Sequence, residues 1–292
     1  DALLPALQTD AQVILCGRVA DPALFLAPLM HHFGWAANDW PQLGQGILVG
    51  HLLECAGQIT GGYFADPGFK GVPNLARLGF PLAEVQADGS AVITKVNGSG
   101  GCVTVATCTE QLLYEIENPA RYLQPDVVAD FSQVRLTPDG ADRVRATGAN
   151  GQQRPDTLKV TVGYHDGYIG EGQMGYAGPG CVARGQLALE LVRQRLQDAG
   201  LGQLEARYEL IGVNSLLPQA QATTEPNEVR LRVAVRSPAR QQAQLVANEV
   251  EALYTNGPAA GGGATKSVRE VVAAAAVLVP RGWAQPDVTL LG

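Results

Sequence analysis

The stretch TLKVTVGYHDGYIGEGQMGYAGPG, residues 157–180, decides the fold of the C-terminal half of the chain. It opens with an apolar-rich run that predicts a strand over 157–164 and passes through a glycine-rich segment. It ends at Gly178-Pro179, a typical start for a helix over 179–199. Two strands (206–213 and 229–235), a helix (239–254) and a last strand (268–279) are predicted to follow. The order strand–helix–strand–strand–helix–strand is that of a ferredoxin-like βαββαβ α+β domain.

The N-terminal part of the chain predicts a strand–loop–helix α/β domain. Ala11–Gly17 is a short apolar run that ends in glycine, which is typical of a buried strand. Asp21-Pro22 then predicts an N-cap followed by proline at the first position of a helix over 23–32. Because α/β folds bind ligands at the carboxyl ends of strands, Arg18 and Asp21 are candidate ligand contacts. A local Arg–Asp ion pair and a helix cap are the alternative interpretation.

A polar, turn-rich segment over 148–155 predicts a linker between an α/β domain at 1–150 and a ferredoxin-like domain at 151–292. Inside the first domain a helix is predicted over 42–59, and we expect close packing to explain its several glycines. Asp88-Gly89 and Asp139-Gly140 each predict a hairpin. The remaining predictions here are a helix over 104–116 and a strand over 126–131.

The sequence GHLLECAGQITGG at 50–62 carries the most titratable chemistry. His51, Glu54 and Cys55 are spaced to share one helical face, where they could act as a general acid–base group on a substrate. The alternative is structural, with Cys55 in the core, Glu54 at its boundary and His51 bonded to backbone. The glycine turn that follows adds candidate ligand contacts: Thr60, Gly61, Gly62, Tyr63 and Asp66.

Two further glycine-rich segments precede predicted helices. Helix N-terminal amides and glycine backbone together bind phosphates and carboxylates, so the segment at 97–101 predicts an anion site, with a threonine-capped turn as the alternative. Its candidate residues are Lys95, Gly98, Ser99, Gly100, Gly101, Thr104 and Thr107. The segment at 170–180 is predicted to be a loop from which Glu171, Tyr176 and Gly178 reach a ligand, and simple mobility is the alternative.

Bulk composition narrows the class of protein. The 292 residues carry a net charge of −7, which disfavours binding to nucleic acid or to an anionic membrane surface. Five scattered cysteines without metal-ligand spacing predict reduced thiols, a cytoplasmic protein and no metal site. No apolar run is long enough to span a bilayer. Because ferredoxin-like domains often serve as oligomerisation modules, we expect a homo-oligomer, although fold alone does not settle function.

Several long motifs resemble the AtuA family, which is named for acyclic terpene utilisation and was formerly a domain of unknown function, DUF1446. They cover nearly the whole chain and include GRVADP (17–22), GHLLECAGQITGGYFADPGFK (50–70), TKVNGSGGCVTVATCTEQLLYEI (94–116) and DTLKVTVGYHDGYIGEGQMGYAGPG (156–180). The resemblance implies a role in bacterial degradation of citronellol- or geraniol-type compounds through branched acyl-CoA thioesters. It also implies that an N-terminal part of the family domain is missing upstream of Asp1.

Two hypotheses about function follow. The first is an enzyme acting on a branched acyl-CoA, or a related acid, by lyase, hydratase or hydrolase chemistry, with no certain cofactor and coenzyme A present only in the substrate. His51 or Glu54 would move a proton, and the amides after Gly98 would hold a phosphate or thioester oxygen. The second is a subunit of the same pathway that binds the small acyl substrate without chemistry of its own.

Overall fold

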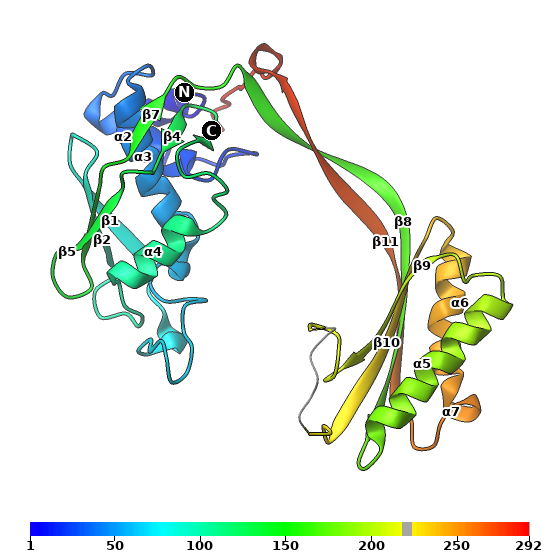
Figure 1. Ribbon diagram of the computed structural model, residues 1–292. Helices are drawn as coiled ribbons and strands as arrows, with labels where there is room; N and C mark the ends of the chain where they lie inside the picture. Colours follow the sequence, from blue (N-terminus) through cyan, green and yellow to red (C-terminus); the bar gives the residue numbers. More distant parts are fainter. Residues whose placement is uncertain (218–223, 292) are drawn as a thin grey trace. The chain divides into compact units, whose positions relative to one another are not determined.

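The chain is described by a computed structural model that covers residues 1–217 and 224–291 (Figure 1). It divides into two compact units: Asp1–Lys159 together with the chain from Leu278 onward, and Val160–Val277. Helices and antiparallel sheets are mixed in both units, which confirms a mixed α/β chain. The domain boundary at 150/151 stays a prediction, because a compact unit need not be a domain that folds alone.

The first unit is built around one buried helix. This helix, α3 (Trp40–Leu53), starts at Asp39, whose carboxylate accepts a hydrogen bond from the Gln42 amide. Nearly every residue from Leu43 to Leu53 is buried. The other helical elements of the unit are α1 (Leu4–Leu7), α2 (Ala23–Phe33), α4 (Val105–Leu113) and the 3₁₀ turns η1 (Ala56–Gln58), η2 (Leu75–Arg77) and η3 (Arg281–Trp283).

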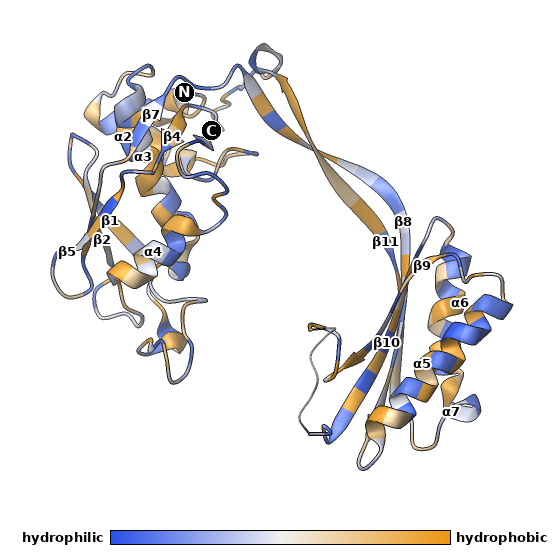
Figure 2. Cartoon of the chain, in the orientation of Figure 1, coloured by the Kyte–Doolittle hydropathy of each residue, from blue (hydrophilic) through white to orange (hydrophobic). Residues whose placement is uncertain are grey.

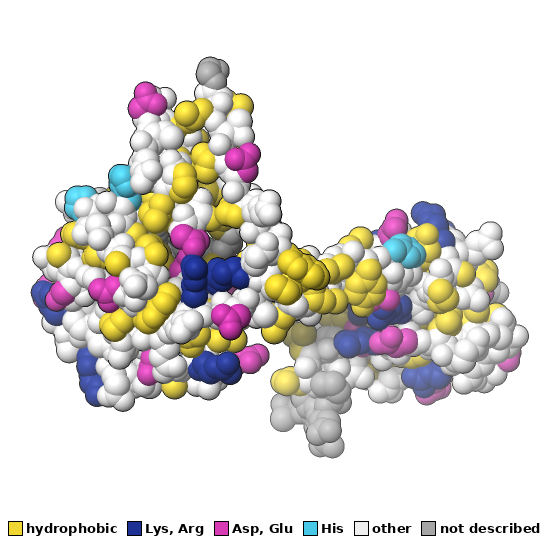
Figure 3. Space-filling model, turned by 90° about the horizontal axis from the view of Figure 1, so that it is seen from above, with side chains coloured by type: hydrophobic (Ala, Val, Ile, Leu, Met, Phe, Trp, Pro, Cys, Tyr) yellow, Lys and Arg dark blue, Asp and Glu magenta, His cyan; other side chains and the backbone are white. Residues whose placement is uncertain are grey.

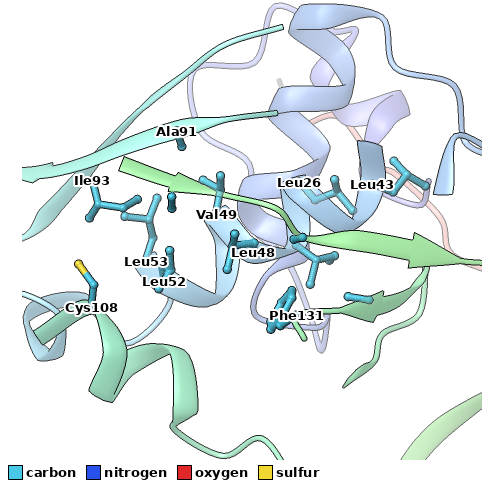
Figure 4. Close-up of a cluster of buried hydrophobic side chains, with 14 of the residues drawn as sticks. Leu26, Leu43, Leu48, Val49, Leu52, Leu53, Ala91, Ile93, Cys108 and Phe131 are labelled. Carbon is cyan, nitrogen blue, oxygen red and sulfur yellow. The ribbon is translucent and has the colours of Figure 1, made fainter. Parts of the chain in front are cut away.

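Glycines on α3 let neighbouring backbone approach the helix axis. A Cβ at Gly44 would lie 2.1 Å from the carbonyl oxygen of Asn150, and one at Gly50 would lie 2.6 Å from that of Pro22. Close packing is therefore the reason for these glycines, as the sequence predicts. The leucines of the same helix, together with Val49, lie at the centre of the hydrophobic core (Figure 4).

Two small antiparallel sheets pack with α3. The predicted hairpins at 88–89 and 139–140 are confirmed and contribute all four strands of the first sheet. Its order is β1 (Pro81–Val85), β2 (Ala91–Lys95), β6 (Val144–Thr147) and β5 (Arg135–Pro138). The second sheet has the order β3 (Tyr122–Leu123), β4 (Val128–Asp130) and β7 (Asn150–Gln152), so part of the predicted linker is a strand.

The predicted strand over Ala11–Gly17 is wrong. Within the described residues the segment has no sheet neighbour, and most of it is exposed, Val13 by 82% and Leu15 by 95%. An apolar run becomes a strand only where another strand satisfies its backbone groups. The predicted cap is also wrong, because Pro22 occupies the N-cap position of α2 and no side chain caps it. The parallel α/β rule that singled out Arg18 and Asp21 therefore has no basis in these antiparallel sheets.

The second unit is a four-stranded antiparallel sheet with helices on one face (Figure 1). The helices α5 (Cys181–Asp198) and α6 (Arg240–Glu251) pack on β10 (Glu228–Ser237), one of the two inner strands, and α7 (Leu253–Asn256) follows α6. Buried leucines, valines and Met174 fill the space between helices and sheet. The strand order is β11 (Gly262–Pro280), β8 (Thr157–Ala177), β10 (Glu228–Ser237) and β9 (Glu205–Ile211).

The predicted ligand loop at 170–180 is wrong for most of its length, because β8 continues unbroken to Ala177. Its glycines lie under helix α6, where a Cβ at Gly170 would be 1.9 Å from the Ala243 carbonyl oxygen. A Cβ at Gly172 would lie 2.5 Å from Val250. Glycine here allows the helix to pack closely on the sheet rather than giving the chain mobility.

Among the residues that the structure describes, no helix has both the length and the apolar character needed to cross a bilayer.

Candidate functional site

The predicted His51–Glu54 pair forms at the end of α3. The His51 Nδ1 atom lies 2.9 Å from Glu54 Oε1, because three residues bring side chains to the same side of the last helical turn. The Nε2 atom lies 3.2 Å from the carbonyl oxygen of Leu112 on α4. The imidazole is 1% exposed and contacts the rings of Tyr122 and Phe131, at centroid distances of 5.4 and 5.9 Å, and these two rings also contact each other at 5.6 Å.

The partners of His51 determine how many protons the pair holds. A carbonyl oxygen only accepts, so Nε2 of His51 carries a proton toward Leu112. A second proton then lies between Nδ1 and Glu54 Oε1, since two bare acceptors would repel each other at 2.9 Å. The pair is either imidazolium with carboxylate or imidazole with carboxylic acid, and it stores one transferable proton in both forms.

Two buried oxygen atoms, one in this pair and one beside it, have no hydrogen-bond donor in the described part of the chain. They are Glu54 Oε2 and Gln111 Oε1. The other end of the Gln111 amide is fixed, because its Nε2 donates to the His51 carbonyl oxygen at 2.9 Å. A buried acceptor without a donor destabilises the fold, so each oxygen indicates a place for a water or a ligand group that donates.

The groups around Glu54 are held in their protonated forms. Burial raises the pKa of the Cys55 thiol, and the carboxylates of Glu54, Glu115 and Asp21 raise it further, against a hydrogen bond from Gln111 that lowers it. Burial and the same carboxylates raise the pKa of the Tyr122 phenol. Cys55 is therefore a thiol at neutral pH, which argues against a role as a nucleophile.

Three of the six non-glycine residues with positive φ angles in the described part of the chain belong to the segments around this site. Ala56, Tyr63 and Glu115 all adopt positive φ angles, of 48°, 63° and 58°. Left-handed backbone is unfavourable for residues other than glycine, and such residues cluster at functional sites. Tyr63 is 94% exposed, so the packing of its own side chain does not explain its conformation.

The segment predicted to bind an anion uses its backbone amides for hydrogen bonds within the protein. Each backbone amide from Ser99 through Thr104 donates to a protein acceptor: Val96, Arg77, Pro73 and Thr60 carbonyls, the Asp142 carboxylate and the Thr107 hydroxyl, in that order. Gly100 and Gly101 are buried against the backbone of Asn74 and Thr60, while Gly98 is exposed. Thr104 and Thr107 form a reciprocal capping box on α4, which is the alternative that the sequence allowed. These amides are satisfied within the protein and leave none in the stretch for an oxyanion.

Lys95, the charged candidate residue of that segment, also bonds to groups within the protein. Lys95 Nζ donates to the Ser99 carbonyl oxygen at 2.9 Å and lies 3.4 Å from Asp142 Oδ2. The Thr60 hydroxyl donates to the Gly79 carbonyl oxygen at 2.6 Å and is fully buried. Both side chains join neighbouring loops in the arrangement described.

The other predicted ligand residues lie in different surroundings. Gly61 packs on Val72, Gly62 packs on the Gly57 carbonyl, and Asp66 is exposed in a turn closed by Lys70. Asp21 is exposed but close enough to Cys55 and Tyr122 to raise their pKa values. Arg18 lies at a groove of about 270 Å³ formed by chain segments near both termini.

Glu171, Tyr176 and Gly178 belong to the second unit. Glu171 Oε2 forms an ion pair with Arg232 at 2.6 Å, and Tyr176 is 1% exposed with its hydroxyl 3.6 Å from the Met174 sulfur. Gly178 has a φ of 76° in the turn before α5. These are roles in sheet and core packing.

Sequence reasoning missed Gln111, Glu115 and Tyr122. A signal for Gln111 exists, because it shares the buried face of α4 with Thr107 and Cys108, and an amide on such a face needs a specific partner. Tyr122 and Glu115 carry no local signal. Among the described residues no group of three or more metal-ligating side chains could hold an ion.

Comparison with known proteins gives one match. Over residues 1–290 the chain matches the family described as acyclic terpene utilisation family protein AtuA. The match confirms the family resemblance and offers no support for a missing upstream region, which stays a prediction. No curated protein and no solved structure matches the chain.

Proposed function

Because the chain belongs to the acyclic terpene utilisation family AtuA, we propose that it is an enzyme of bacterial acyclic terpene catabolism. It acts on a branched acyl-CoA, of the kind formed from citronellol or geraniol, or on a related acid. The reaction is acid–base chemistry of the lyase, hydratase or hydrolase type.

The observation that carries this proposal is the Glu54 carboxyl group. One oxygen contacts a histidine with which it shares a proton, and the other is buried without a donor. A carboxyl group in this state can accept a proton from a substrate or from water and return it, while His51 compensates the change of charge.

The structure assigns different exposure to the two residues. The Glu54 side chain is 11% exposed and that of His51 is 1% exposed, which supports Glu54 rather than His51 as the residue that contacts a substrate. Glu54 is accordingly the proposed catalytic residue. His51 acts through it as a positioning residue, held by Leu112 and by two aromatic rings.

The charge around Glu54 limits what binds there. Asp21 and Glu115 make the surroundings acidic, which favours the neutral acyl part of a thioester and disfavours its phosphates. The anionic part of coenzyme A would therefore bind elsewhere on the protein. The predicted ligand residues at 60–66 and 95–107 stay proposals for that part, through their side chains, because the backbone amides from Ser99 to Thr104 donate within the protein.

Turnover of a panel of branched acyl-CoA thioesters, together with deuterium exchange into the acyl chain, tests the assignment. We expect Glu54→Gln to reduce turnover at least about 100-fold, in the range of a lost general acid–base group. Glu117→Gln, an exposed carboxylate nearby in sequence, is the matched control and should keep wild-type rates. Equal turnover in wild type and Glu54→Gln would remove Glu54 from the mechanism.

A second candidate function is favoured by the satisfied amides of the Ser99–Thr104 loop and by the burial of His51. A protein with these features could bind the acyl substrate without converting it. Thermal stabilisation by a branched acyl-CoA, without turnover or exchange in the full-length protein, would favour this binding subunit over the enzyme.

We also propose a ferredoxin-like fold for the second unit and a cytoplasmic location for the protein. The strand order β11-β8-β10-β9, with helices after β8 and β10, supports a ferredoxin-like plait for the second unit. Five free cysteines support a reducing, cytoplasmic setting.

A further inference from the structure

The side-chain amide of Gln111 is held in one orientation. The residue is fully buried and belongs to α4, which carries both hydrophobic and hydrophilic residues (Figure 2). Its Nε2 atom donates to the His51 carbonyl oxygen at 2.9 Å. Exchanging the amide nitrogen and oxygen would set two acceptors against each other, so Oε1 is fixed on the other side of the amide.

The amide nitrogen of Gln111 also acts on Cys55. Burial raises the pKa of the Cys55 thiol, whereas a hydrogen bond from Gln111 lowers it, as a bond donated to the sulfur does. The nitrogen therefore serves two acceptors. The oxygen has no donor among the described residues, and neither has Glu54 Oε2. Because an unpaired buried acceptor destabilises a fold, both oxygens indicate a donor that the described chain does not supply.

The two unpaired oxygens belong to side chains at the same turn of α3. Glu54 directly follows the last residue of this helix, and its Oε1 atom is 2.9 Å from His51 Nδ1. Gln111 bonds to the backbone of His51 and to the side chain of Cys55, so its amide spans this turn. A water molecule has two hydrogens, which matches two acceptors.

The charges near these oxygens limit the kind of donor. The carboxylates of Asp21 and Glu115 are close enough to act on Cys55, so a negatively charged ligand is disfavoured. Within the described residues no group of three metal-ligating side chains exists to hold a cation. Acidic and basic side chains are interspersed on the face that Figure 3 shows, so no broad field of one sign gathers ions there. A neutral O–H group fits these conditions.

We propose that one water molecule bridges Glu54 Oε2 and Gln111 Oε1, and that this water is a reactant. The inference rests on the proposed function and narrows it to reactions in which water is added to the substrate. Glu54 exchanges the proton, and Gln111 is a positioning residue that acts through the water. With both hydrogens donated to the protein, the water oxygen keeps its lone pairs for a carbon atom of the substrate.

The bridging water gives one proton to Glu54 Oε2 as its oxygen forms a bond to a substrate carbon. In a branched enoyl substrate, the electron pair of the C=C π bond moves to the neighbouring carbon, which takes that proton from Glu54. In thioester hydrolysis, the C–S bond breaks instead and the departing sulfur takes the proton. Glu54 is restored in both cases, and the product contains the oxygen of the water.

A crystal structure of the full chain, refined with its ordered waters, tests the binding site. We expect one water within hydrogen-bond distance of both Glu54 Oε2 and Gln111 Oε1. Absence of water from both oxygens, or a separate water on each, overturns the bridging site. A donor from the protein itself on Gln111 Oε1, such as the Cys55 thiol, overturns it as well.

Turnover of branched enoyl-CoA and acyl-CoA thioesters in H₂¹⁸O tests the role as reactant. The product should carry one labelled oxygen, in a new hydroxyl group for hydration or in the released carboxylate for hydrolysis. Product without label overturns the reactant role and leaves the proposed enzyme intact. If the wild type converts no thioester, the reactant role fails together with the proposed function, while the crystal structure still decides whether the water binds.

Gln111→Met keeps the length of the side chain and removes its oxygen. It should lower kcat about 10–100-fold, as expected for a misplaced reactant, and leave KM unchanged. Gln45→Met is the matched control, because Gln45 lies earlier on α3 and also has a buried side-chain oxygen without a donor in the described chain. The control should keep both constants. A wild-type kcat in folded Gln111→Met overturns the positioning role, and if that variant does not fold, the crystal structure and the label decide.

Discussion

The close approach of β7 to helix α3 makes Gly44→Ala the most informative single substitution in the first unit. The added Cβ would lie 2.1 Å from the Asn150 carbonyl oxygen and 2.8 Å from the Gly151 nitrogen. Both are backbone atoms of a paired strand, so neither can rotate away as a side chain would. The helix or the strand has to move by about 1 Å to restore van der Waals contact.

Two opposing effects set the size of the change. Alanine favours a helix over glycine by about 1 kcal/mol. Inserting a methyl group into a close-packed core costs about 1–3 kcal/mol, and more where backbone is displaced. We expect a net loss of about 2 kcal/mol, which corresponds to a fall in melting temperature of about 4–8 °C for a unit of this size.

Thermal and urea unfolding, followed by circular dichroism, measure this loss. Gly46→Ala is the matched control on the same helix, because its Cβ would meet the movable end of the Leu26 side chain at 2.5 Å. It should cost clearly less than Gly44→Ala. If Gly44→Ala is as stable as wild type, the helix and the strand are not held as closely as described, and the position assigned to His51 at the end of that helix is also in doubt.

Three further predictions concern charge and capping. Burial and the Glu115 carboxylate both raise the pKa of the Cys55 thiol, so Glu115→Gln should speed alkylation of that cysteine at pH 8; an unchanged rate, followed by mass spectrometry, contradicts the placement of Glu115. Burial raises the pKa of the Glu171 carboxyl group, but hydrogen bonds from Arg232 and Gln173 lower it by more. The pKa of Glu171 therefore lies below its ordinary value of 4.5. A lowered native pKa stabilises the protein above pH 4.5, and this stabilisation is lost as pH falls through the native value, so Glu171→Gln should be less stable than wild type at pH 7 but not in strong acid; a gap in urea stability that persists at low pH argues against it. Thr104→Ala removes the N-cap of α4 and should cost about 1 kcal/mol in urea unfolding, and a cost near zero would mean that the cap contributes nothing.

Local chemistry in the sequence was sufficient for the hairpins and for the start of α4. Asp88-Gly89 supplies the backbone freedom of a tight turn, and Thr104 caps α4, whatever surrounds them. The i, i+3 spacing of His51 and Glu54 was likewise enough to predict their contact, since a helix fixes it. These features depend on residues only a few positions apart.

The candidate site beyond that pair depends on distant segments. Gln111 and Tyr122 reach His51 from α4 and β3, and Gln111 lies 60 residues away along the chain. The position of Gln111 on a buried helix face indicates that it has a partner but does not identify His51, and the sequence around Tyr122 gives no signal at all. The amides after Gly98 appeared free in the sequence, but distant carbonyl and side-chain acceptors satisfy most of them.

The sequence by itself determined the hairpins of the first unit, the order of strands and long helices in the second unit, and the family, because apolar periodicity, turn residues and long motifs are properties of short stretches. Only the tertiary structure shows which glycines form turns and which are needed because another element packs against their backbone, as α6 does at Gly170. It also decided that Ala11–Gly17 is not a strand, because a strand needs a partner for its backbone groups and an apolar sequence does not say whether one is there.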